Sequence, residues 1–183
     1  MNLSKSLLLA CAVALTPGLA IAHDMPPIKP VNGVDLPRFM GDWYVIASIP
    51  TRFEKDAYNA LESYKLTSDG DVATSFHYRD GSFDKPVKSI HSTGFIKKDT
   101  GNAVWGVQVI WPIKAQYIVA WLDPDYSQVI IARDKRDYAW IMARTPMVSQ
   151  ADYDALVAKV KSMGYPVDKI RKVPQSWPAS ATR

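Results

Sequence analysis

The stretch GDWYVIASI, residues 41–49, combines a glycine with a run of β-forming residues. Alternate residues point to opposite faces of a strand, so Trp43, Val45 and Ala47 are predicted to share one face. Gly41 lets the backbone turn where a Cβ would clash, and Trp43 places a large ring at the start of a core. The pattern predicts the first strand of an all-β core.

Further β-type segments follow at intervals of about 8–12 residues, a spacing typical of a sandwich or an up-and-down barrel. Together with the first, they cover residues 42–49, 58–67, 71–79, 87–97, 103–111, 116–122, 127–133 and 138–144. Short connections rich in Asp, Gly and Ser join them, which favours pairing between neighbours in the sequence. We therefore expect an all-β fold, an eight-stranded up-and-down antiparallel barrel, because closure removes the exposed strand edges.

One C-terminal α-helix is predicted over residues 149–163. Ser149 is a good N-cap with Asp152 three residues later, and Gly164 followed by Pro166 ends the helix. Its apolar stripe consists of Tyr153, Leu156, Val157 and Val160. The outside of the barrel is the surface available to bury that stripe, so we expect the helix to pack there.

The N-terminal residues 1–22 have the features of a secretory signal: a lysine, a short apolar run and Ala20-Ile21-Ala22 as a cleavage site. Cleavage there predicts a periplasmic or secreted protein. The only cysteine, Cys11, ends a Leu-Leu-Ala-Cys sequence that superficially matches a lipoprotein acylation site, so an outer-membrane lipoprotein is the alternative. A chain cleaved after Ala22 has no cysteine for disulfide or thiol chemistry.

The remainder, residues 23–183, is expected to form one domain. Its parts are an extended leader at 23–37, the barrel at 38–146, the helix and a tail at 174–183 whose end is disordered.

The charge is mildly basic, with 22 Lys and Arg residues against 18 Asp and Glu residues and a formal net charge of +4. Because the basic residues are interspersed with acidic ones, nucleic acid is not an expected partner, whereas a peripheral membrane contact stays open. His77 and His91 are isolated, and no metal-ligand spacing or phosphate-binding glycine loop occurs in residues 23–183. We expect no cofactor, no metal and no enzyme activity.

Three separate motifs lie along the chain: GDWY at 41–44, LDPDY at 122–126 and WIMARTP at 140–146. With these motifs the chain resembles the lipocalin family, specifically the bacterial outer-membrane lipocalins and their apolipoprotein-D-like relatives in plants and animals. The resemblance covers about residues 32–173. It implies that Arg144 packs over Trp43 and closes one barrel end, as a cation–π contact.

The sequence departs from this family pattern in two places. Typical bacterial members carry a lipidated cysteine at the mature N-terminus, and this chain has none at an equivalent position. Many also have an acidic residue where this chain has Val45, so its first strand is more apolar.

A barrel of about eight strands encloses room for one small ligand, so the inward face of each strand bears on function. Along 103–111 the larger, wholly apolar set is Ala103, Trp105, Val107, Val109 and Trp111, and we expect it inside. The same argument yields the predicted ligand-binding set: Val45, Ala47, Phe53, Glu62, Tyr64, Phe76, Tyr78, Trp105, Val107, Val109, Tyr117, Val119, Trp121, Tyr138, Trp140 and Met142. Structural roles are assigned to Gly41, Trp43 and Arg144.

Glu62 is the one acidic member of this set and is in phase with Tyr64. A buried carboxylate needs a partner, so Glu62 either contacts a ligand's head group or lies in water near an open end. The rest of the set, rich in Trp and Tyr, suits acyl chains or flat apolar molecules.

We expect binding, transport or storage of a small hydrophobic ligand, a fatty acid or lysophospholipid, in the bacterial cell envelope by a monomer or weak homodimer. The alternatives are a lipocalin-fold enzyme of the isomerase or de-epoxidase type that acts on a bound lipid, and an envelope interaction module with no ligand.

Overall fold

The computed structural model describes residues 25–52 and 54–178. Its strands are β1 (Gly41–Ile49), β2 (Ala57–Leu66), β3 (Val72–Asp80), β4 (Val87–Ile96), β5 (Val104–Ile110), β6 (Ile113–Leu122), β7 (Gln128–Ala132), β8 (Ala139–Ala143) and β9 (Arg171–Lys172). The helices are α1 (Leu36–Phe39), α2 (Gln150–Ser162) and the 3-10 turn η1 (Val167–Lys169). The predicted signal, residues 1–22, and the tail end, 179–183, lie outside the described residues.

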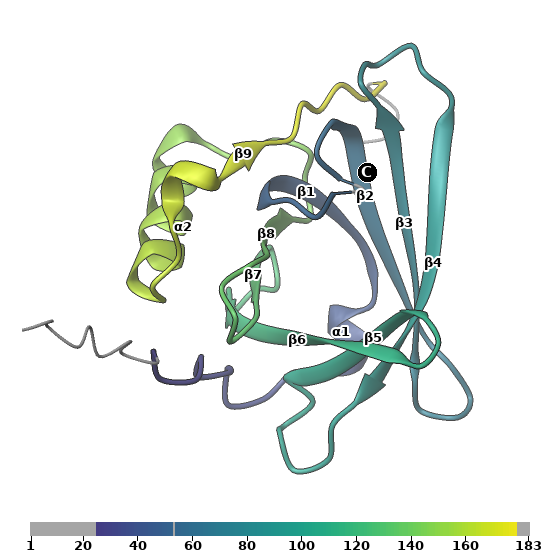
Figure 1. Cartoon of the computed structure of the whole chain (residues 1–183), viewed down its shortest axis with the longest axis vertical. Coiled ribbons are helices and arrows are strands. Elements are labelled where there is room, and N and C mark those ends of the chain that lie inside the picture. The colour runs from purple at the N-terminus through teal and green to yellow at the C-terminus, as the bar shows by residue number, and fades with distance from the viewer. Residues whose placement is uncertain (1–24, 53, 179–183) are drawn as a thin grey trace, which may run out of the picture.

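The strands form a closed antiparallel barrel (Figure 1). Strands β2 to β8 are neighbours in sequence order, and β1 pairs with both β8 and β2, which closes the sheet. The predicted fold class, an eight-stranded up-and-down antiparallel barrel with one C-terminal α-helix, is therefore confirmed. The ninth strand is a short addition to β1.

Closure creates two separate apolar cores. One fills the barrel interior and contains Trp43, Tyr64, Phe76, Trp105 and Tyr117. The other lies outside the barrel, where Leu156 and Val160 of α2 pack on Ile46, Ile130 and Ile141. Figure 1 shows α2 beside β7, β8 and β1 on the outer face. The strands below the helix are thus buried on both faces, which explains the run of apolar residues in β7.

The start of α2 follows the local sequence signal. The Ser149 side chain accepts a hydrogen bond from the Asp152 backbone N–H at 3.1 Å, as the predicted N-cap requires. The predicted apolar stripe faces the barrel, with Leu156 and Val160 buried and Tyr153 and Val157 partly buried beside them. None of the helices in the described ranges is long and apolar enough to cross a membrane.

The two ends of the described chain lie along the barrel. In the leader, Val31 N–H donates to the Val119 carbonyl at 2.9 Å, and Val34 N–H donates to that of Gly101 at 2.8 Å. At the other end, β9 pairs with Ala47 and Ser48 of β1.

The segment after β9 closes a gap in the barrel wall. Strands β1 and β2 pair only as far as Tyr44 and Leu61, and residues 173–176 continue from there. The Gln175 side chain donates to the carbonyls of Val45 in β1 and Ala60 in β2, at 2.8 and 3.1 Å. The C-terminal segment therefore ties together two strands that have separated.

Candidate ligand site in the barrel interior

One end of the barrel is closed by Trp43 and Arg144. The Arg144 guanidinium lies 3.8 Å from the Trp43 ring centroid, the arrangement that the resemblance implied. Its nitrogens also donate to a ring of backbone carbonyls, those of Arg38, Phe39, Met40, Asp42 and Tyr126. Because the half-buried guanidinium is both stacked and hydrogen-bonded, it stays charged.

Gly41 has a backbone reason to be glycine at this closed end. Its φ is +90°, a conformation that residues with a Cβ rarely adopt. A Cβ there would lie 3.5 Å from Arg144 Nη1, an ordinary contact distance, so the backbone conformation alone favours the glycine. The glycine thus allows the chain to turn from α1 into β1 directly beside the guanidinium.

Aromatic rings fill the interior above this end. Trp105 stacks on Tyr117 with centroids 4.8 Å apart, and the Tyr117 and Tyr64 hydroxyl oxygens are 2.8 Å apart. Burial raises the pKa of both tyrosines well above the usual value of 10, so they act as neutral hydrogen-bonding groups. This end of the interior is apolar with one buried hydroxyl pair.

Most of the predicted set faces the interior. The apolar members that pack in the interior core are Val45, Tyr64, Phe76, Tyr78, Trp105, Val107, Tyr117, Val119, Trp140 and Met142. Alternation along each strand was enough to orient them, because their strands are regular up to these positions.

Ala47 and Trp121 point the other way, so the inward orientation predicted for them is wrong. A β-bulge lies between Val45 and Ala47 in β1, and another lies between Val119 and Trp121 in β6. Each bulge inserts one residue, and every later side chain then changes face. Ala47 and Trp121 consequently pack in the outer core beneath α2.

The inward orientation predicted for Val109 is also wrong, because this residue is 57% exposed. The β4–β5 pairing runs from Ile96–Trp105 to Thr93–Gln108, and Val109 lies just beyond it. The β5–β6 hairpin therefore extends past the barrel wall, with Trp111 83% exposed at its tip, so the inward face predicted for Trp111 is wrong as well.

Phe53 and Tyr138 are two further members of the predicted ligand-binding set. Phe53 lies outside the described residues. Tyr138 precedes β8 and is partly buried, with the Arg133 guanidinium 5.2 Å from its ring centroid and the Trp140 centroid 6.3 Å away.

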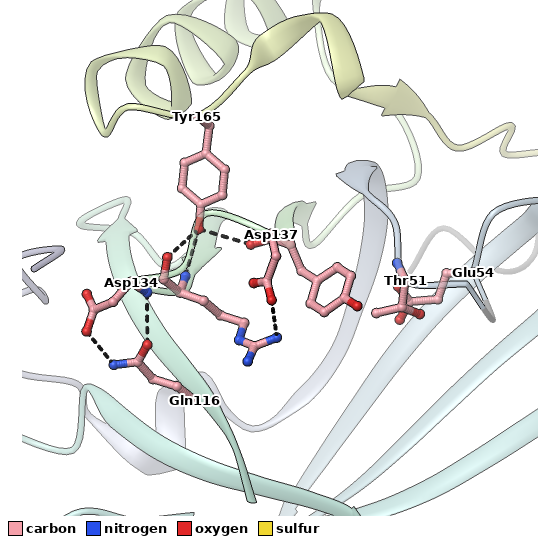
Figure 2. A network of polar contacts seen from close by, with 8 residues as sticks. Thr51, Glu54, Gln116, Asp134, Asp137 and Tyr165 are labelled. Carbon is pink, nitrogen blue, oxygen red and sulfur yellow. Dashed lines mark hydrogen bonds and ion pairs between the residues drawn. The ribbon is translucent and has the colours of Figure 1, made fainter. Parts of the chain in front are cut away.

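The loop that carries Tyr138 is held by a polar network (Figure 2). The Tyr165 hydroxyl accepts from the Arg133 backbone N–H at 2.7 Å and lies 3.0 Å from the Tyr138 carbonyl. Asp134 is fixed by two hydrogen bonds with the Gln116 side chain, at 2.7 and 2.8 Å. These bonds anchor the β7–β8 turn to β6 and to the end of α2.

Glu62 faces the interior, opposite Trp43 in β1 and Phe76 in β3. Its Oε2 is buried and has no hydrogen-bond partner among the described residues, whereas the residue as a whole is partly buried. Contact with a ligand's head group and a position in water near an open end therefore both stay predictions. Burial, and to a smaller extent the charge of Glu54, raises the pKa of Glu62 to about 8. Glu62 is therefore mainly protonated at neutral pH.

Glu54 is a partly buried carboxylate that the sequence reasoning missed. It lies in the loop between β1 and β2, yet its Oε2 accepts from Thr51 N–H at 3.1 Å and from Trp140 Nε1 at 3.3 Å. Burial raises its pKa, although both hydrogen bonds oppose the shift. Figure 2 shows the Thr51–Glu54 pair across from the Asp134–Asp137 turn. No local pattern marks a loop glutamate that turns inward.

Two hollows on the surface lie outside the barrel. One of about 710 Å³ is bounded by β2, β3 and the C-terminal segment, with Leu61, His77 and Trp177 in its wall. The other, of about 420 Å³, contains Lys55, Lys169 and Arg171. Neither is lined by a residue of the predicted set.

Comparisons with known proteins match this architecture. A family model described as a lipocalin-like domain matches residues 34–175. Temperature-induced lipocalin-1 of Arabidopsis thaliana is 31% identical over 156 residues, which cover 80% of this chain and 82% of that protein. Outer membrane lipoprotein Blc of Escherichia coli K12 is 28% identical over 173 residues, 92% of this chain and 96% of that one.

Solved structures show the same fold. Insecticyanin of the tobacco hornworm Manduca sexta superposes with a TM-score of 0.62 at 18% identity, covering 86% of this chain and 88% of that one.

Proposed function

The chain belongs to the lipocalin family, whose members bind small hydrophobic ligands, and we propose that this one binds a fatty acid or lysophospholipid in its barrel for transport or storage. The observation that carries the proposal is the interior face. Aromatic and aliphatic side chains from β1 to β8 converge there, and the polar groups that border them include the Tyr64–Tyr117 hydroxyl pair, the Trp140 indole N–H and the carboxyls of Glu54 and Glu62. Such a lining suits an acyl chain.

The energetics favour a long chain. Each buried acyl CH₂ contributes about 0.8 kcal/mol, so a tail of about 16 carbons contributes on the order of 10 kcal/mol before ordering costs. Affinity in the micromolar range or tighter follows without a strong head-group site.

Titration with saturated fatty acids and lysophospholipids of increasing length, followed by tryptophan fluorescence, tests the proposal. The chain has six tryptophans, and Trp105 and Trp140 lie in the interior core. Affinity should rise with length and then level off when the interior is full. Absence of binding by any C12–C18 lipid, or affinity independent of length, would overturn it.

The same experiment separates the other candidates. A carrier returns its lipid unchanged, whereas an isomerase or de-epoxidase converts it, and an interaction module binds no lipid. Lipid recovered after incubation and examined by mass spectrometry distinguishes the three outcomes.

We also propose an envelope location. The relative in Escherichia coli is named an outer membrane lipoprotein, and residues 1–22 have the sequence of a secretory signal. The proposed form is a periplasmic or secreted monomer or weak homodimer; the lipoprotein anchored through Cys11 is the alternative. Sedimentation of the mature chain over a range of concentrations measures the oligomeric state.

A further inference from the structure

The chain contains two glutamates, Glu54 and Glu62, and both side chains reach the barrel interior. They come from different elements: Glu62 from the middle of β2 and Glu54 from the loop before it. Glu54 contacts Trp140, and Glu62 lies opposite Trp43 and Phe76; these three rings belong to one interior core, so both carboxyls border the same interior.

One carboxyl oxygen of the pair lacks a hydrogen-bond partner among the described residues. Glu54 accepts one backbone and one indole N–H through Oε2. Glu62 Oε2 is buried with no hydrogen-bond partner in the described part of the chain. A buried polar atom without a partner destabilises the protein, and a ligand that supplies a donor would recover that free energy.

The cations near the interior are already engaged. Arg144 is surrounded by backbone carbonyls and stacked on Trp43. Lys88, on the interior face of β4 at the other end, is paired with Asp80 at 2.6 Å. The ion pairs among the described residues include neither glutamate. Within the described ranges, the two acidic groups therefore border an apolar environment without an ion-pair partner.

Aromatic rings complete the surroundings. Trp43 and Phe76 are the cross-strand neighbours of Glu62, Tyr78 stacks on Phe76 with centroids 5.0 Å apart, and Trp140 contacts Glu54. Carboxylates beside aromatic faces are the chemistry that recognises an organic ammonium ion, through charge pairing and cation–π attraction. An incoming carboxylate would instead meet two acidic groups.

We propose that Glu54 and Glu62 form a cation subsite inside the barrel, which receives the ammonium group of an amphiphile. The ligand is a long-chain amine or a lysophospholipid with an amine head group. This inference rests on the proposed function and specifies the lipids that the barrel prefers.

The test compares three C12 ligands that differ only in the head group: dodecylamine, dodecanol and dodecanoate, each below its critical micelle concentration at pH 7. Wild type should bind dodecylamine on the order of tenfold or more tighter than dodecanoate. Glu62→Gln should lose most of that preference while its affinity for dodecanol is retained. Asp125→Asn, which removes an exposed acidic charge in the β6–β7 turn, is the matched control and should behave as wild type.

A second pair, lysophosphatidylethanolamine and lysophosphatidylglycerol with one acyl chain, distinguishes the source of the ammonium group. Preference for the ethanolamine lipid assigns the subsite to a phospholipid head, and preference in the C12 series alone assigns it to a simple amine. Equal affinities within both pairs would overturn the inference while leaving lipid binding intact. No binding by any of the five ligands would overturn the proposed function itself.

Proton release is an independent readout. A bound cation stabilises the ionised Glu62, so dodecylamine binding at pH 7 should release protons, and its affinity should rise toward pH 8. Among the described residues, the titratable groups that interact with Glu62 are Glu54, Tyr64 and Tyr117, and Arg144 acts on Tyr64 behind them. Calorimetry in buffers of different ionisation enthalpy measures the number of protons released. Both Glu62→Gln and Glu54→Gln should reduce that number. Proton uptake, or no exchange in the wild type, would contradict the subsite.

Discussion

At the scale of single residues, Trp43 shows how one ring can close a barrel. It is fully buried, its indole N–H donates to the Phe39 carbonyl at 2.8 Å, and its face carries the Arg144 guanidinium. The ring therefore serves at once as core filling, hydrogen-bond donor and counterpart of a charge. Removing it disturbs all three contacts.

Trp43→Ala should lower the free energy of unfolding by about 3–5 kcal/mol, because a large buried ring leaves a cavity. Arg144→Ala should cost less. Denaturant melts of both variants give the values, and Trp111→Ala is the matched control, since that ring is 83% exposed and its loss should cost less than about 0.5 kcal/mol. A wild-type midpoint for Trp43→Ala would contradict the closed-end assignment.

Glu62 predicts a pH dependence of stability with a definite sign. Its pKa rises from the ordinary 4.5 to about 8 in the folded chain. The folded state therefore keeps a proton that the unfolded state releases, so this contribution is fully present below pH 4.5 and is lost as pH rises through 8. Glu54 adds a dependence of the same sign, because burial also raises its pKa.

Glu62→Gln should thus flatten the decline in stability between pH 4.5 and 8. Relative to wild type, the free energy of unfolding of the variant should rise by on the order of 2–4 kcal/mol across that pH window. Urea melts at several pH values measure the change, and Asp125→Asn should keep the wild-type slope. An identical slope for Glu62→Gln would mean that the carboxyl is hydrated.

At the scale of elements, the C-terminal segment completes the barrel wall. Gln175 bonds to both β1 and β2, and the Asn59 side chain bonds to the Ser176 backbone in both directions, at 2.7 and 2.8 Å. Val173 packs against the interior core. A stretch without regular structure therefore serves as part of the sheet closure.

Gln175→Ala should cost about 1–3 kcal/mol, because two buried carbonyls lose their donor. Ser176→Ala is the control, since its bonds to Asn59 use backbone atoms only. Thermal melts compare the two, and equal losses would show that Gln175 does not tie the strands.

The β5–β6 hairpin is the element that suits a membrane surface. Its tip exposes Val109, Ile110, Trp111 and Ile113, with Lys114 beside them. A tryptophan among aliphatic residues, followed by a lysine, resembles the amphipathic composition of interfacial segments. This surface is where a peripheral membrane contact would form.

Trp111→Ser should weaken co-sedimentation with anionic lipid vesicles several-fold while leaving the melting midpoint unchanged. Met147→Ser is the control: that side chain is 77% exposed but follows β8 at the closed end, so its loss should not change sedimentation. Equal binding by Trp111→Ser and wild type would remove the hairpin from any membrane contact.

At the scale of the whole molecule, the secretory signal proposed for residues 1–22 predicts one mature form. Intact-mass measurement of protein purified from its own envelope should give a chain that begins at His23. A diacylglyceryl mass on Cys11 would contradict this and favour the anchored lipoprotein.

Much of the fold could be predicted because its signals are local. Turn residues separate the strands, alternation within each regular strand orients side chains such as Trp105 and Phe76, and Ser149 caps α2 through a bond to a neighbour three residues away. These signals depend on a few adjacent residues, which the sequence alone determines.

Only the tertiary structure decided the rest. The faces of Ala47 and Trp121 depend on bulges that arise when each strand is matched to its partner's register. The inward turn of Glu54 depends on Trp140, far away in the chain. The repair of the β1–β2 gap by Gln175 likewise depends on contacts over more than a hundred residues. Such contacts exist only after the barrel closes, so no local pattern encodes them.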